Sequence, residues 1–238
     1  MLPKETPSPT PEDVATIIID SSFVGTKAEC VYEKLIKNGK ESIINKLISG
    51  FDIDKSIIDL KFRVDTIKAN GEVNYLTVNN RALLEITINE ARLNDASLEI
   101  ARTILHECFH AYIYGKYYQN ELHTGLCPEP DFKRDFDNYT KKYGRENDHN
   151  YMADKYRSFM IEGLKTYLQN EKYYDKILPI LKENIFWVNE DFMLECMTWG
   201  GLHNTNAWKE YYKDTQKEQY DNQRKFIINL LPKEKCEK

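Results

Sequence analysis

The sequence predicts an α+β domain in which a small antiparallel sheet is followed by a long buried helix and a helical C-terminal half. Apolar residues recur at helical spacing along most of the chain, but between residues 58 and 88 they alternate with polar residues as in strands. Strands and helices therefore occupy separate stretches and do not alternate as in a parallel α/β fold. With 238 residues, 41% of them hydrophobic, the chain is long enough to bury one core.

Residues 1–25 are predicted to be a tail or linker, because their proline-rich stretch PKETPSPTPED favours extended conformations and adds nothing to a core. Residues 26–238 are expected to form a single domain. A tether of this kind also suggests that a targeting segment or another domain preceded it. A cytoplasmic location is the default expectation, since the five cysteines are scattered and form no C-x-x-C pair.

Two short helices are expected over residues 26–37 and 42–49, where apolar residues fall at helical spacing before Gly50. Three strands should follow, namely IDLKFRVDTI, VNYLTV and LLEITI, and Asn70-Gly71 is a hairpin signal between the first two. This order predicts a three-stranded antiparallel meander.

A long amphipathic helix is expected to begin after Asn94-Asp95 and to end near Gly115. The irregular segment that follows should border the functional site, because connections of this length are usually functional. Another helix is expected from Asn147-Asp148 to about Gln169, and further helices should reach the C-terminus with breaks at Pro179 and Gly200-Gly201.

The long helix carries His106-Glu107-Cys108-Phe109-His110, which is the H-E-x-x-H pattern. Two imidazoles four residues apart lie one turn above the other on a helix and can bind one metal ion together. Glu107 lies about 100° round the helix from His106, where its carboxylate can take a proton from water. The pattern predicts a metal site with Glu107 as general base. The alternative is a pair of hydrogen-bonded core histidines, which would make an unpaired Glu107 costly to bury.

Zn²⁺ is the expected ion, because two imidazoles and a third nitrogen ligand suit it and a catalytic zinc site keeps one position open. We favour His149 as the third ligand, because a residue at the start of a helix holds its geometry better than a loop residue. The alternative nitrogen ligand is His123, in the irregular segment. Acidic alternatives are Glu146, Asp154 and Glu162.

Further site residues are predicted from their positions near His149 or in later segments. Asp154 could accept a hydrogen bond from a metal-bound imidazole, which such ligands usually require, or it could be a solvated helix residue. Tyr151, Tyr156 and Arg157 are candidates for stabilising an oxyanion. His203 could donate a hydrogen bond to substrate, although a histidine there is more often an ordinary buried or loop residue.

The segments ILHECFHAYIY, DHNYMADKYRSFMIEGLK and TWGGLHNTNAW together resemble SprT-like zinc metallopeptidases, and the resemblance covers about residues 27–208. It implies a zincin-like fold in which a strand precedes the H-E-x-x-H helix. It also implies His149 as the third ligand, since that residue matches the histidine of an H-N-x-M-A-type helix start. His123 instead matches the short loop position used by SprT proteins that act on DNA-bound protein, but the cysteine-ligated zinc module of those proteins is missing.

Charge and hydropathy exclude other function classes. Lys and Arg number 33 and Asp and Glu 38, which gives a net charge of −5. No stretch gathers basic residues into a block that could follow a phosphate backbone, so nucleic acid is a poor default partner. No apolar run approaches the roughly 18 residues of a membrane span. We therefore expect a zinc-dependent metallopeptidase that acts on protein or peptide substrates. The alternatives are an inactive zinc-binding domain in assembly or secretion, and a DNA-associated SprT-type protease.

Overall fold

The computed structural model describes residues 17–37, 42–49, 58–78, 81–122, 148–170, 179–180, 183, 190–203, 205, 208–209 and 214–231. Its elements are, in chain order, β1 (Ile17–Ile19), α1 (Lys27–Ile36), α2 (Ile43–Ser49), β2 (Ile58–Asp65), β3 (Gly71–Val78), β4 (Arg81–Asn89), η3 (Glu90–Arg92), α3 (Ser97–Leu122), α5 (Asp148–Lys155), α6 (Arg157–Asn170), α8 (Glu190–Thr198) and α10 (Asp214–Leu230). The predicted α+β class is confirmed.

The sheet has four strands in the order β1-β2-β4-β3 and is mixed. The predicted antiparallel meander is wrong, because β2 pairs with both β1 and β4 in parallel and only β3 and β4 are antiparallel. The physical reason lies in Asn89 at the end of β4. Its side-chain amide donates hydrogen bonds of 2.7 Å to the carbonyls of Ile67 and Ala69. The chain after β2 is therefore held across the end of β4. Asn70-Gly71 then leads into β3, the edge strand on the side of β4 away from β2.

Residues 17–25 belong to the fold, although we predicted residues 1–25 to be a tail or linker from the proline-rich stretch before them. Ile17–Ile19 form the edge strand β1, and Phe23 is fully buried. The Phe23 ring packs against Tyr32 and Phe62, with centroids 6.1 and 5.8 Å away. Thr26 then caps α1, because its hydroxyl accepts a hydrogen bond from the backbone N–H of Glu29 at 3.2 Å.

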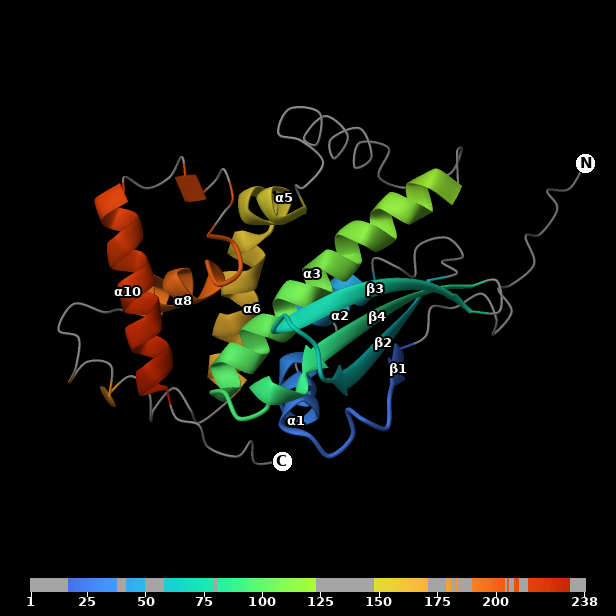
Figure 1. Ribbon diagram of the computed structural model, residues 1–238, viewed down its shortest axis with the longest axis horizontal. Coiled ribbons are helices and arrows are strands. Elements are labelled where there is room, and N and C mark those ends of the chain that lie inside the picture. Colours follow the sequence, from blue (N-terminus) through green and yellow to red (C-terminus); the bar gives the residue numbers. More distant parts are fainter. Residues whose placement is uncertain are drawn as a thin grey trace, which may run out of the picture.

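Helix α3 lies between the two parts of the molecule: Figure 1 shows the strands on one side of it and α6, α8 and α10 on the other. Residues 96–111 are all buried, as expected for a helix that is covered all round. The helix continues to Leu122 and does not end near Gly115, which is itself buried. The single helix expected after Asn147 is two helices, α5 and α6, that meet at Tyr156.

Two further observations bear on the environment of the protein. No helix among the described residues is long and apolar enough to cross a membrane. Cys30 is disulfide-bonded, whereas Cys108 and Cys196 are buried and free.

Candidate metal centre

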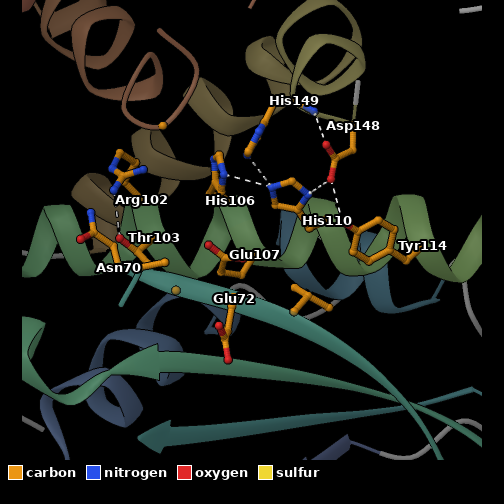
Figure 2. Close-up of a pocket in the computed structure, with 14 residues that line it drawn as sticks. Asn70, Glu72, Arg102, Thr103, His106, Glu107, His110, Tyr114, Asp148 and His149 are labelled. Atoms are coloured by element: carbon orange, nitrogen blue, oxygen red, sulfur yellow. Dashed lines mark hydrogen bonds and ion pairs between the residues drawn. The ribbon is translucent and has the colours of Figure 1, made fainter. Parts of the chain in front are cut away.

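Three histidines meet above the sheet. His106 and His110 come from α3, and His149 reaches down from the start of α5 (Figure 2). The Nε2 atom of His110 is 3.1 Å from Nε2 of His106 and 3.0 Å from Nε2 of His149. One ligand atom from each residue lies within 4.8 Å of the others. The structure thus brings together the three histidines that the sequence selected, and they could hold a metal ion.

The chemistry of the donor set fits a metal ion. His106 and His110 are buried and His149 is half-buried, so water cannot fully solvate three ring nitrogens that face one another. Burial, together with the neighbouring His110, lowers the pKa of His106 and of His149, which favours the neutral imidazoles that metals require. Where these ring nitrogens are unprotonated their lone pairs face one another, and a cation between them would remove the repulsion.

Asp148, immediately before the His149 ligand, orients the site. Its Oδ2 atom lies 3.0 Å from His110 Nδ1 and accepts a 2.7 Å hydrogen bond from the hydroxyl of Tyr114. Burial alone would raise the pKa of Asp148, but the hydrogen bonds from His110 and Tyr114 outweigh it and hold that pKa below its usual range. An ionised Asp148 keeps the proton of His110 on Nδ1 and leaves Nε2 free to bind.

The structure does not bring Asp154 to the imidazoles. Asp154 is partly exposed on α5, where it pairs with Lys155 at 3.4 Å. Asp148, which the sequence suggested only as a helix start, fills the role that was predicted for Asp154. Asp148 directly precedes His149 in the sequence, and this position could have identified it. Both residues lie in the first turn of α5, which brings both side chains to His110.

Glu107 lies between the imidazoles and strand β3 (Figure 2). A Cβ atom at Gly71 would be 2.7 Å from Glu107 Cγ and 2.8 Å from Oε1, so the missing side chain of Gly71 makes room for this carboxylate. Burial raises the pKa of Glu107 to about 7, against the opposing effect of His110 and Arg102. A carboxyl group with a pKa near neutrality can both take and return a proton.

The histidines open onto a cavity of about 390 Å³. Residues 69–73, around the start of β3, form one wall, and α3 supplies the floor. Arg102 and Thr103 lie toward one end of the cavity, and Tyr114 and Asp148 toward the other (Figure 2). Gly201, from the turn after α8, also lines it. The site is therefore reachable by a ligand and is built from both halves of the chain.

The predicted oxyanion donors lie elsewhere. Tyr151 is buried and Tyr156 stacks on Phe109, with centroids 5.3 Å apart, on a different face of α3 from the imidazoles. Arg157 pairs with Glu195 at 3.3 Å and lies over the ring of Trp199. None of these three candidates lines the cavity.

The remaining candidates are also separated from the imidazoles or are not described. His203 Nε2 is 3.3 Å from Asp221 Oδ1 and does not line the cavity. Glu162 lies at a separate apolar hollow beside Phe109. His123 and Glu146, the alternative ligands from the irregular segment, lie outside the described residues.

Comparison with protein-family models, with curated proteins and with solved structures found no match to this chain. The resemblance to SprT-like metallopeptidases therefore stays a prediction from the sequence. Any function assigned to the site must rest on its geometry and chemistry.

Proposed function

We propose that the protein is a zinc-dependent peptidase, which hydrolyses peptide bonds in protein or peptide substrates. The observation that carries this proposal is the convergence of three imidazole nitrogens beside a buried carboxylate at the floor of an open cavity. Structural zinc sites are closed by four protein ligands, whereas catalytic sites use three and leave one position open. The described residues offer three.

Zinc is the ion that suits this donor set best. Three neutral imidazoles are typical zinc ligands, whereas Mg²⁺ and Ca²⁺ prefer oxygen ligands. A Zn²⁺ ion held by His106, His110 and His149 would act as a Lewis acid, which polarises a carbonyl group and acidifies water.

Glu107 is the proposed general base. Its carboxylate takes a proton from the water that attacks the peptide carbonyl carbon, and the resulting carboxylic acid returns this proton to the leaving amine. Burial against Gly71 supports both steps, because it brings the pKa of Glu107 to about 7 and so makes either protonation state accessible at neutral pH. Asp148 and Tyr114 act indirectly, since they fix the ring of His110.

The test is turnover of an unfolded protein by zinc-loaded protein between pH 6 and 9. Glu107→Gln should retain zinc but lower kcat/KM at least about 100-fold, because the amide cannot accept the proton. Glu72→Gln is the matched control: Glu72 lines the same cavity and loses the same charge, yet should stay within about tenfold of wild type.

Two results would contradict the proposal. Zinc retention without turnover of any substrate by wild type would favour an inactive zinc-binding domain. Turnover by Glu107→Gln within tenfold of wild type would show that Glu107 is not the base. A DNA-associated protease is tested separately, by salt-dependent retention on DNA.

A further inference from the structure

A glycine turn from the C-terminal half touches the metal centre. Gly201 follows α8 and has a φ of +85°, which side-chain-bearing residues rarely adopt. A Cβ atom at this position would lie 3.1 Å from Cε1 and 3.5 Å from Nε2 of His106. Gly201 is exposed and lines the cavity. Its main chain therefore lies beside the ring nitrogen that faces His110, with no side chain between it and the cavity.

The turn is fastened to the helix that carries the imidazoles. Arg102, one helical turn before His106, donates a 3.0 Å hydrogen bond from Nη1 to the carbonyl of Gly200. Glu99 holds Arg102 through Nη2 at 2.8 Å and lies 3.3 Å from Nη2 of Arg224 on α10. Arg102 and Glu99 are both at most 5% exposed, so the bond to Gly200 is protected from water. The position of the turn relative to His106 is thus fixed by buried, charge-assisted hydrogen bonds.

The main chain of Gly201 offers a donor and an acceptor. The N–H groups on either side are used within the turn, since Gly200 donates to Met197 and Leu202 donates to Trp199. Among the residues that the structure describes, the N–H and C=O of Gly201 make no hydrogen bond. Backbone groups at a cavity wall must be satisfied by water or by a ligand. An adjacent donor and acceptor are complementary to the main-chain amide of another polypeptide.

We propose that the Gly200-Gly201 turn positions the substrate: Gly201 hydrogen-bonds the main chain of an extended polypeptide beside His106, and Arg102 is a positioning residue that holds the turn in place. The inference rests on the proposed peptidase function, because it states how the same site holds its substrate. It also explains why the wall carries no side chain there. A main-chain contact is independent of substrate sequence, and glycine allows the two backbones to approach closely.

The test compares two inhibitors of the zinc-loaded protein. Acetohydroxamate can reach only the metal, whereas a tripeptide hydroxamate also needs the cavity walls. In Gly201→Ala, the added Cβ also presses on His106, so the quantity compared is the ratio of the two affinities. The ratio of tripeptide to acetohydroxamate affinity should fall at least about tenfold relative to wild type. Gly25→Ala is the matched control, since Gly25 has a similar φ of +76° but has nothing within 4 Å of an added Cβ.

A second pair of variants addresses the role of Arg102 and does not depend on the folding of Gly201→Ala. Arg102→Gln should reduce the ratio of tripeptide to acetohydroxamate affinity, and Arg102→Lys, whose ammonium can still donate to Gly200, should restore part of it. Arg224→Gln removes a guanidinium that packs against Gly200 but makes no hydrogen bond to it, so its ratio should stay closer to that of wild type than the ratio of Arg102→Gln does. A merely structural Arg102 would lower the thermal midpoint and leave the ratio unchanged.

The outcomes separate this inference from the proposed activity. An unchanged affinity ratio in both Gly201→Ala and Arg102→Gln, or equal weakening of both hydroxamates, overturns the inference even if the wild type hydrolyses peptides. Selective loss of the tripeptide hydroxamate supports it, even if wild type shows no hydrolysis and the peptidase proposal fails.

Discussion

Helix α3 carries two clusters of polar side chains that are shielded from water, and the two clusters differ in how their polar groups are satisfied. The ion-pair cluster consists of Glu99 and Arg102 with Arg224 from α10, and the Glu99 carboxylate pairs with both guanidiniums. The histidine cluster consists of His106 and His110 with His149 from α5, and its facing ring nitrogens could hold a metal ion. A polar group buried with its partner fastens the fold, whereas a polar group buried without one marks a place for a ligand.

Variants of the histidine cluster should change zinc affinity, whereas variants of the ion-pair cluster should change the free energy of unfolding. Among them, His149→Ala should have the largest effect on zinc affinity. A third imidazole contributes a large share of the binding free energy, so its loss should weaken zinc binding about 100-fold or more. Competition with a chelator at one pH measures this effect. His123→Ala is the control and should change little. If His123→Ala strips the metal while His149→Ala keeps it, the histidine cluster is not the zinc site.

The converse variant removes the carboxylate of the ion-pair cluster. Glu99→Gln leaves the buried guanidinium of Arg102 and the partly buried one of Arg224 without this counter-charge. It should lower the free energy of unfolding by about 3–5 kcal/mol in urea titrations. Glu195→Gln breaks the more exposed pair with Arg157 and should cost less than about 1 kcal/mol. Zinc affinity of the folded protein should be unchanged in both. A Glu99→Gln protein as stable as wild type would mean that the cluster does not fasten the fold.

Variants of Asp148 and Tyr114 test how strongly residues around the histidine cluster affect its zinc affinity. Asp148→Asn keeps the shape but loses the charge that orients His110, and should weaken zinc binding about 10- to 100-fold. Tyr114→Phe removes one hydrogen bond to Asp148 and should have a smaller effect in the same direction. Asp154→Asn is the control on the same helix. Equal zinc affinity in Asp148→Asn and Asp154→Asn would contradict the assigned role of Asp148.

The sequence predicted the parts of the site that depend on local geometry. Helical spacing alone brings His106 and His110 together, and the helix start at Asp148 led correctly to His149 as a neighbour. The choice between Asp148 and Asp154 depended on how α5 packs on α3, which spacing does not encode. Gly201 and Arg224 reach α3 from distant segments, and no local pattern links them to His106 or Glu99.

In the fold, too, the sequence predicted the local features but not the long-range ones. Alternation of apolar and polar residues identified β2, and its burial alternates as predicted along its whole length. The pairing of β2 with β4 was missed, because adjacent strands in sequence are the default neighbours and Asn70-Gly71 is a strong turn signal. The hydrogen bonds of Asn89 that hold the connecting segment join residues 22 and 20 positions apart, so no local pattern shows them.

The smallest predicted effect concerns the pH dependence of the free energy of unfolding, through His203 near Arg224 of the ion-pair cluster. Burial, and then the positive charge of Arg224, lower the pKa of His203 below its ordinary value. The unfolded chain therefore takes up a proton at this residue at a higher pH than the folded protein does, and the free energy of unfolding should fall as the pH drops below about 6.5. His203→Gln removes this contribution, so the difference in urea midpoint between wild type and variant should shift in favour of the variant from pH 7.5 to pH 5.5. The titrations of the other histidines cancel in that difference. A difference that stays constant with pH would mean that burial and the charge of Arg224 do not lower the pKa of His203 in the folded protein.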